Sequence, residues 1–356
     1  MNIAILCKTF LKGGAEKQAL ILTKLLIENG FNVCLINWYG EKVDKRNLKF
    51  ISDNSFRYYP MTGNHLKKFI DYTKILKQEG ISVILSYLTL SNFLSGLSKL
   101  LFRGVISIGG IRNEKLPFHK FLFERFIHNY FNDATIFNNY SAKEKLEKRG
   151  FNSGKIYVIQ NAIEIINSKF NVRVSNGKIK IATVGRFVKQ KDFGTALKSF
   201  SYLVHKNSNK QFIYYIVGYG PLENQLRSLS ERLKVNDRIK FLINPSDIGA
   251  ILDQSDIFLS TSLFEGVSNS IMEAMVAGLP VVATNVGDNK FLIKDGHNGY
   301  LVPCSDVGAI VEKLEYLSGS EEIRNEFGKN SLKVIETEFS QNKMLSSYLS
   351  LLSKFQ

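Results

Sequence analysis

The amino-acid sequence predicts an α/β protein made of two consecutive doubly wound units, each a parallel sheet covered by helices on both faces. Its 356 residues exceed one typical domain and suit two of ordinary size. Short apolar segments of strand length alternate with longer segments of helical period, which favours parallel sheets. This alternation starts again near residue 180, so we expect two sheets rather than one.

The first unit begins with an apolar strand over residues 2–7 and a glycine-containing turn. Residues 16–28 place apolar side chains at helical spacing, and an Asn-Gly pair follows, as is common at helix ends. An apolar strand over residues 31–38 completes the first strand–helix–strand unit. The alternation continues with helices over 66–78 and 91–101 and strands over 82–86 and 105–108.

The second unit follows a segment without a strong period. Residues 164–178 (EIINSKFNVRVSNGK) form this segment, which we interpret as a linker between two domains. The next elements are strands over 180–184, 212–217, 239–243, 257–260 and 281–284 and helices over 193–204, 222–233 and 270–276. A last helix over about 340–353 has no strand of its own beside it.

The positive charge of the chain is concentrated in its first half. The formal net charge is +15, and residues 1–163 carry 24 Lys and Arg against 12 Asp and Glu, or +12. Nucleic acid, anionic lipid and a phosphorylated acceptor would each favour such a surface. A lysine-rich, solvated surface without a partner is the alternative.

Several features indicate a location in the cytoplasm, or at most on a membrane surface. The apolar stretch at the N-terminus is too short for a signal peptide, and no segment approaches the roughly 18 to 20 apolar residues of a membrane span. The three cysteines are widely spaced, which argues against a disulfide framework or a zinc site.

Three glycine-bearing turns follow predicted strands. They contain Gly13-Gly14, Gly185 and Gly218-Tyr219-Gly220. Glycine lets backbone N–H groups approach a phosphate, and the next helix adds the positive end of its dipole. A tight strand-to-helix turn without a ligand is the alternative for each.

Arg186 and Lys191 are two cations five residues apart, between a strand and a helix. A guanidinium and an ammonium group at this position suit a diphosphate leaving group, on which negative charge develops. Two solvated charges are the alternative.

The segment from Phe264 to Met275 (FEGVSNSIMEAM) carries the strongest signal in the chain. Glu265 precedes a glycine turn, and Glu273 lies about one turn into the following helix. The two carboxylates would flank the helix start, where the backbone donors of residues 266–268 are exposed. Carboxylates accept hydrogen bonds from sugar hydroxyls, so the arrangement suits a hydroxyl-rich ligand; an ordinary surface helix with two glutamates is the alternative.

With these motifs, the sequence resembles the retaining glycosyltransferases of family 4, of the type that builds bacterial surface polysaccharides such as capsule and lipopolysaccharide. The element E-x7-E followed by AMxxGLPVVAT is its most specific part. The resemblance rests on GGAE at 13–16, KIYVIQNAIE at 155–164, VGRFVKQKD at 184–192, VGYGPLENQL at 217–226, DIFLSTSLFEGVSNSIMEAMVAGLPVVATNVGDN at 256–289 and DGHNGYLV at 295–302.

The resemblance implies the GT-B fold, in which two Rossmann-like domains face each other across a cleft. Residues 1–163 would form the acceptor-side domain and residues 179–339 the domain that binds the nucleotide-sugar donor. The terminal segment 340–356 would pack back on the first domain, which accounts for a helix without a sheet.

The resemblance also implies roles for individual residues. Arg186 and Lys191 would hold the donor diphosphate as it leaves, and Glu265 would act on the transferred sugar, giving a catalytic set of three. Arg112 would lie on the acceptor side. The implied donor-binding set is Gly14, Gly185, Arg186, Lys191, Gly218, Gly266, Val267, Ser268, Asn269 and Glu273.

The implied reaction is transfer of a hexose or N-acetylhexosamine, with retention at the anomeric carbon, from a nucleotide diphosphate-sugar, with UDP as the expected nucleotide. The acceptor would be a glycan or a polyprenyl-diphosphate-linked sugar. No cofactor, metal or nucleic acid is expected, and the chain contains no Asp-x-Asp motif. A nucleotide-sugar hydrolase or phosphorylase of the same fold, and a non-catalytic sugar- or nucleic-acid-binding module, are the alternatives.

Residues 116–131 (LPFHKFLFERFIHNYF) combine aromatic and cationic side chains within the basic half. A helix with this pattern can rest on anionic lipid, with Phe118, Phe121, Leu122, Phe126 and Ile127 entering the headgroup boundary. The same side chains can instead form the buried face of a domain helix. Both interpretations stay open at this point.

Overall fold

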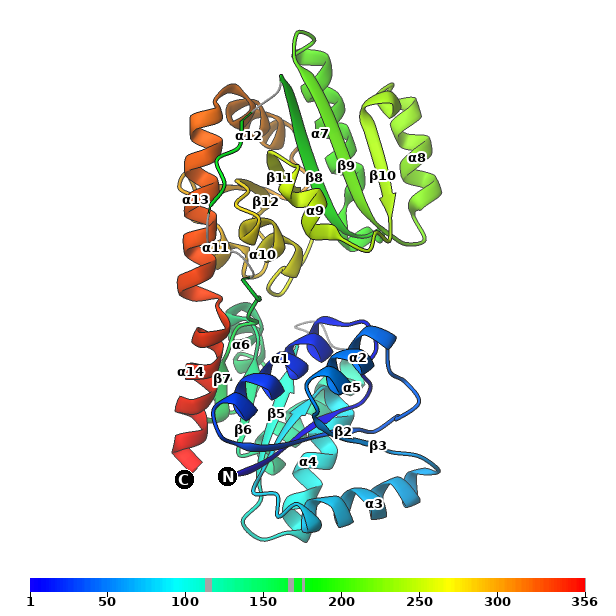
Figure 1. Cartoon of the computed structure of the whole chain (residues 1–356), viewed down its shortest axis with the longest axis vertical. Coiled ribbons are helices and arrows are strands. Elements are labelled where there is room, and N and C mark those ends of the chain that lie inside the picture. Colours follow the sequence, from blue (N-terminus) through cyan, green and yellow to red (C-terminus); the bar gives the residue numbers. More distant parts are fainter. Residues whose placement is uncertain (113–116, 166–169, 175–176, 356) are drawn as a thin grey trace. The chain divides into compact units, whose positions relative to one another are not determined.

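The computed structural model describes residues 1–112, 117–165, 170–174 and 177–355. The chain divides into two compact units, one of residues 1–162 with the segment from Gln341 onward, and one of Ile163–Ser340 (Figure 1). Each unit is an α/β structure with one parallel sheet. None of the described helices is both long enough and apolar enough to cross a bilayer.

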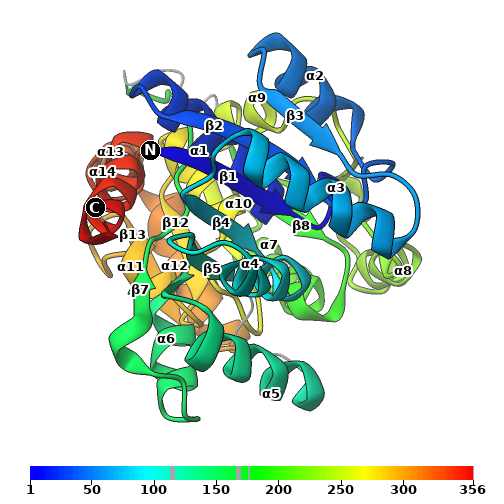
Figure 2. The ribbon, with the colours of Figure 1, turned by 90° about the horizontal axis from the view of Figure 1, so that it is seen from below.

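The first unit contains a seven-stranded sheet of order β3-β2-β1-β4-β5-β6-β7 (Figure 2). The order places β1 between β2 and β4, so the direction of winding changes between β1 and β4, which is the Rossmann pattern. The strands are β1 (Asn2–Cys7), β2 (Asn32–Asn37), β3 (Arg57–Pro60), β4 (Val83–Tyr87), β5 (Ile106–Ile111), β6 (Ala134–Phe137) and β7 (Ile156–Val158).

The helices of the first unit cover both faces of this sheet. They are α1 (Gly14–Glu28), α2 (Lys45–Asp53), α3 (His65–Gln78), α4 (Thr89–Leu101), α5 (Phe118–Phe126), which continues as a π-helical turn over Ile127–Phe131, α6 (Tyr140–Glu147) and α14 (Gln341–Leu352). Helix α14 packs beside α1 through buried Met344, Leu345 and Tyr348. The C-terminal helix thus completes the core of the first unit.

The second unit repeats the pattern with six parallel strands in the order β10-β9-β8-β11-β12-β13. Its direction of winding changes between β8 and β11. The strands are β8 (Lys178–Arg186), β9 (Gln211–Tyr219), β10 (Ile239–Ile243), β11 (Ile257–Ser260), β12 (Val281–Thr284) and β13 (Gly299–Val302). The helices are α7 (Phe193–Lys206), α8 (Glu223–Arg232), α9 (Ile248–Asp253), α10 (Asn269–Val276), α11 (Asn289–Leu292), α12 (Val307–Gly319) and α13 (Glu321–Glu338).

The strands read as continuous apolar runs because both faces of each sheet are buried. Along β1, Ile3 and Ile5 enter one hydrophobic cluster, while Ala4 and Leu6 enter the cluster on the other face. In β8, Ile181 and Ala182 divide in the same way between two clusters. Successive side chains of these strands thus alternate between two hydrophobic cores, which explains why the sequences of the strands show no polar face.

The described part of the segment interpreted as a linker belongs to the second unit. Arg173 binds main-chain carbonyls of this unit, and Asn325 exchanges two hydrogen bonds with the Arg173 backbone, at 2.8 and 3.0 Å. These contacts are set by residues distant in sequence, so the segment's lack of period gave no sign of them. Residues 166–169 and 175–176 of the predicted linker lie outside the described residues.

Candidate active site

The loops that follow β8 and β11 meet at the carboxyl edge of the second sheet, where the direction of winding changes. Ligands of open α/β sheets bind at such a point. Lys191 comes from the loop after β8, and Glu265 comes from the loop after β11. The Lys191 ammonium donates a hydrogen bond to Glu265 Oε1 and forms an ion pair with it. Folding therefore joins two site residues that are 74 positions apart.

The Glu265 carboxylate is held in place from two sides. Its side chain is buried, and Ser262 Oγ donates a hydrogen bond to the same Oε1 atom at 2.7 Å. A buried charge needs such partners, because leaving it without them would cost several kcal/mol. Sequence reasoning did not identify Ser262, although a hydroxyl three residues before a carboxylate in one loop was the available signal.

The backbone around Lys191 is fixed by a turn and by one threonine. Asp192 adopts a left-handed conformation (φ 43°, ψ 49°), and its side chain caps α7 by accepting from Thr195 N and Oγ1 at 3.3 and 2.7 Å. Thr261 Oγ1 lies 3.1 and 2.9 Å from the carbonyl oxygens of Lys191 and Asp192. These bonds fix the backbone of Lys191, so that its side chain points towards Glu265 and does not extend freely into solvent.

Gln190 links the loop after β8 to the loop after β11 through hydrogen bonds. Its carbonyl accepts from Leu263 N at 2.8 Å, and its side-chain amide donates to Phe264 O at 2.9 Å. The loop after β12 adds a third attachment, because Asp288 N donates to Gly266 O at 3.1 Å. Hydrogen bonds therefore hold the Glu265 loop on both sides. Gln190 is, after Ser262, a second residue of the site that was not predicted from the sequence.

The segment Gly266–Asn269 leads directly into α10. Val267 and Ser268 are buried, whereas Gly266 and Asn269 are partly exposed. Ser268 is the N-cap residue, and its side chain makes no capping hydrogen bond to the first-turn N–H groups. Glu273 is partly exposed one turn into the helix. This helix start can receive negative charge from a ligand.

Glycine occurs at positions 185 and 218, near the ends of β8 and β9, for two different physical reasons. A Cβ on Gly218 would lie 1.8 Å from Gly185 O, and its φ of +149° is itself rare for other residues, so glycine permits the close pairing of the strands. A Cβ on Gly185 would instead meet the methylenes of Lys191 at 3.4 Å. Gly185 therefore lies beneath the Lys191 side chain.

Arg186 ends β8 in register with Tyr219, and its side chain is exposed. The structure thus places Arg186 and Lys191 on one loop but gives them different surroundings. Lys191 is already paired with Glu265, whereas the Arg186 side chain is open to solvent.

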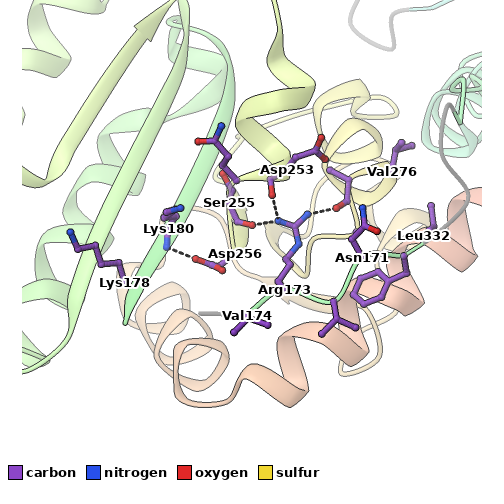
Figure 3. Close-up of a pocket in the computed structure, with 15 residues that line it drawn as sticks. Asn171, Arg173, Val174, Lys178, Lys180, Asp253, Ser255, Asp256, Val276 and Leu332 are labelled. Atoms are coloured by element: carbon purple, nitrogen blue, oxygen red, sulfur yellow. Dashed lines mark hydrogen bonds between the residues drawn. The ribbon is translucent and has the colours of Figure 1, made fainter. Parts of the chain in front are cut away.

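The opposite, amino edge of the same sheet holds a cavity of about 370 Å³ around Arg173 (Figure 3). The guanidinium donates to the carbonyls of Asp253 at 2.8 Å, of Ser255 and of Ala277, which lie at the ends of α9 and α10. Burial lowers the pKa of Arg173. Cations stabilise the negative ends of helices, so Arg173 is occupied with the fold rather than with a ligand.

Gly14 and Arg112 belong to the first unit. Gly14 is exposed and begins α1, after Gly13 at the N-cap. Arg112 follows β5, donates to Asn161 Oδ1 at 2.7 Å, and places its guanidinium 4.8 Å from the centre of the Tyr87 ring. Both lie at the carboxyl edge of the first sheet.

The predicted amphipathic helix is present as α5 and the π-helical turn, but the prediction of its exposed face is wrong for two residues. Phe121 and Ile127 are 3% and 0% exposed, because they pack into the first unit. Every fourth residue instead forms an exposed apolar row, made of Phe118, Leu122, Phe126 and Tyr130. Leu116, at the start of the predicted helix, lies outside the described residues.

Comparison with known proteins connects this geometry to a family. Residues 164–334 match the model of a family described as glycosyl transferases group 1. This part of the chain belongs to the group 1 glycosyl transferases. The match includes the loops after β8 and β11, and therefore Arg186, Lys191, Glu265 and Glu273. The finer assignment to family 4 stays a prediction.

Two curated relatives are glycosyltransferases by name and differ in coverage. An Escherichia coli UDP-Gal:alpha-D-GlcNAc-diphosphoundecaprenol alpha-1,3-galactosyltransferase is 28% identical over 49% of this chain and 48% of its own length. The chain thus matches about half the length of this relative. A Campylobacter jejuni alpha-1,4-N-acetyl-D-galactosaminyltransferase, whose named substrate is a PP-undecaprenol glycan, is 25% identical over 93% of this chain and 92% of its own length.

Among solved structures, HepE from Anabaena in complex with UDP has a TM-score of 0.86 at 16% identity, covering 99% of this chain and all of HepE. At this identity the likeness concerns the fold alone. The α/β fold with two Rossmann-like domains, predicted from the resemblance to GT-B enzymes, is confirmed.

Proposed function

We propose that this protein is a retaining glycosyltransferase that moves a hexose or N-acetylhexosamine from a UDP-sugar to a glycan or lipid-linked acceptor in cell-surface polysaccharide synthesis. The observation that carries the proposal is the Lys191–Glu265 ion pair. The pair lies between two hydrogen-bonded loops, at the point where the second sheet changes its direction of winding, in the unit that matches the group 1 glycosyl transferases. Catalysis by electrostatic stabilisation requires charges that are fixed before the reaction begins.

In the proposed mechanism the donor diphosphate lies at the carboxyl edge of the second sheet. Arg186, Lys191 and the start of α10 stabilise negative charge as the diphosphate leaves. Glu265 and the backbone of Gly266–Asn269 bind the transferred sugar, and Glu273 accepts from ribose hydroxyls. The acceptor attacks from the face that the diphosphate leaves, so the anomeric configuration is retained. The mechanism assigns no role to a metal ion.

The names of similar proteins support the choice of donor and acceptor. One relative uses UDP-Gal and two act on glycans linked through diphosphate to undecaprenol, while the HepE structure contains UDP. For this chain we accordingly propose a UDP-sugar donor and a lipid-linked acceptor. The exposed row on α5, beside Lys120 and Arg125, suits contact with an anionic membrane, and we propose a peripheral location on the inner face.

Binding of nucleotides to the purified chain tests the proposal. UDP and UDP-sugars should raise the melting temperature, whereas GDP and ADP should not; at 100 times Kd the stabilisation should be about 2.7 kcal/mol. Glu273→Ala should weaken the UDP shift, and Glu231→Ala, which removes an exposed glutamate from α8, should leave it unchanged. No shift with any nucleotide would contradict the donor site.

The products then distinguish a transferase from a hydrolase of the same fold. With UDP-sugar and a lipid-linked acceptor, a transferase yields UDP and a lengthened glycan. Release of free sugar at the same rate with and without acceptor would instead indicate hydrolysis. NMR of the new glycosidic linkage reports whether the configuration is retained.

A further inference from the structure

A cavity of about 490 Å³ lies within the first unit, outside the residues matched by the family model. Its lining comes from α5 and from the carboxyl ends of three strands: Lys8 follows β1, Leu88–Leu90 follow β4, and Arg112 follows β5. Strands β1 and β4 are the pair between which the first sheet changes its direction of winding. The cavity therefore occupies the ligand-binding position of this sheet, as the loops after β8 and β11 do in the second.

Three cations among the described residues line the cavity and come from separate segments: Lys8, Arg112 and Lys120. Within the part of the chain that the structure describes, neither lysine forms an ion pair with a carboxylate. Arg112 is held by Asn161 and by the Tyr87 ring, and neither partner carries a negative charge. Three positive charges at one opening favour a ligand with more than one negative charge.

Among the described residues, one carboxylate, that of Glu124, also lines the cavity, but it is bound into the fold. Its side chain is 2% exposed and accepts from Asn92 Nδ2 at 3.2 Å, and Asn92 in turn donates to Gly110 O at 3.2 Å. Burial raises the pKa of Glu124, so its negative charge is disfavoured. The described lining of the cavity thus keeps a positive balance in spite of this residue.

Apart from Thr89, the rest of the described lining is apolar. Leu88, Leu90, Ile111, Pro117 and Phe123 contribute to it, and the Phe123 ring packs 5.4 Å from Phe93. Leu88 has φ 72° and ψ 164°, a region that is almost reserved for glycine. A leucine in this conformation costs stability, and backbone strain of this kind is concentrated at functional sites.

We infer that this cavity binds an isoprenoid diphosphate, with Lys8, Arg112 and Lys120 on the diphosphate and the apolar wall on the first isoprene units. The inference rests on the proposed function, because it assigns the lipid-linked diphosphate of the acceptor to particular residues of the first unit. Inorganic anions would satisfy the cations alone and a fatty chain the apolar wall alone. An isoprenoid diphosphate satisfies both.

Isothermal titration with farnesyl diphosphate tests the inference. Saturating UDP is present throughout, so that the diphosphate site of the second unit is occupied. Farnesyl diphosphate should bind at least about tenfold more tightly than inorganic pyrophosphate or farnesol. Lys8→Ala and Lys120→Ala should each weaken its binding by about tenfold. Lys74→Ala removes an equally exposed lysine from α3, away from the cavity, and should leave the affinity unchanged.

UDP binding to each variant is measured separately and separates the two hypotheses. Normal UDP binding without farnesyl diphosphate binding would overturn the inference and leave the proposed function in place. Equal affinity for pyrophosphate, or equal weakening by Lys74→Ala, would also overturn it, because the site would then be one for anions in general. Absence of UDP binding would count against the proposed function, whatever farnesyl diphosphate does.

Discussion

The two edges of the second sheet use charged side chains in opposite ways. At the amino edge, Arg173 is surrounded by main-chain carbonyls at the ends of α9 and α10. At the carboxyl edge, Arg186 is exposed, and Lys191 contacts a carboxylate in a loop whose backbone is braced from both sides. At the amino edge the cation stabilises the fold, whereas at the carboxyl edge Arg186 is at the surface and Lys191 is paired with a side chain of the candidate site.

This contrast between the two edges shows that a cavity and a cation do not by themselves indicate a ligand site. The cavity at the amino edge contains a buried arginine, yet its guanidinium already donates to four carbonyl oxygens of the fold. At the carboxyl edge, by contrast, hydrogen bonds hold the loop backbone and the Lys191–Glu265 pair, and the Arg186 side chain is exposed. Substitutions at the two edges should accordingly affect different properties.

Lys191→Ala should lower the rate of UDP formation from the UDP-sugar by about 10²-fold or more, because it removes a fixed charge at the leaving diphosphate. Lys189→Ala is the matched control, since it removes an exposed lysine from the same short helical turn. The measurement is UDP release under single-turnover conditions. Equal losses in both variants would show that the carboxyl edge acts through its general charge and not through the Lys191–Glu265 pair.

Arg173→Lys should lower the free energy of unfolding by about 2–3 kcal/mol, because a single ammonium cannot reach the ends of both α9 and α10 and leaves carbonyls without donors. UDP affinity of the folded protein should stay the same. Urea denaturation and UDP titration measure the two properties. Lys178→Ala, in the lining of the same cavity, should change stability by less than about 0.5 kcal/mol. A loss of UDP affinity in Arg173→Lys with intact stability would abolish the contrast between the edges.

In the first unit, His128 is likewise a titratable residue that contacts other groups of the fold and not a ligand site. It is fully buried, its Nδ1 and Nε2 atoms lie 2.9 Å from Thr135 Oγ1 and 3.0 Å from Asn152 O, and burial lowers its pKa to about 4. Since the folded pKa is below the unfolded one, its contribution to stability is present above about pH 6.5 and is lost as the pH falls towards 4.

The free energy of unfolding should therefore decrease by about 2 kcal/mol between pH 7 and pH 5 through His128 alone. Urea denaturation at the two pH values measures this decrease. His128→Asn should flatten the pH dependence, whereas His119→Asn, at an exposed position of α5, should preserve it. An unchanged slope in His128→Asn would mean that other groups carry the acid sensitivity.

Much of the fold followed from local pattern. The strand–helix alternation predicted two parallel sheets because apolar runs such as residues 2–7 and 257–260 are short and bounded by turns. The elements that were not predicted from the sequence include α2, β3, β6, α6, α9, β13, α12 and α13. Several of them, such as β3 (RYYP) and α9 (IGAILD), are short or mostly half-exposed, so their apolar period is weak.

The residue types and loops of the candidate site could be predicted from the sequence, because Arg186 and Lys191 follow a recognisable strand and a glycine, and Glu265 follows a strand and precedes a glycine turn. Only the tertiary structure decided that Lys191 and Glu265 touch, that Ser262 and Gln190 hold them, and that Arg173 belongs to the second unit. The physical reason is that periodicity is a property of neighbours along the chain. Contacts between loops 70 or more residues apart are set by the order of strands in the sheet, which periodicity does not encode.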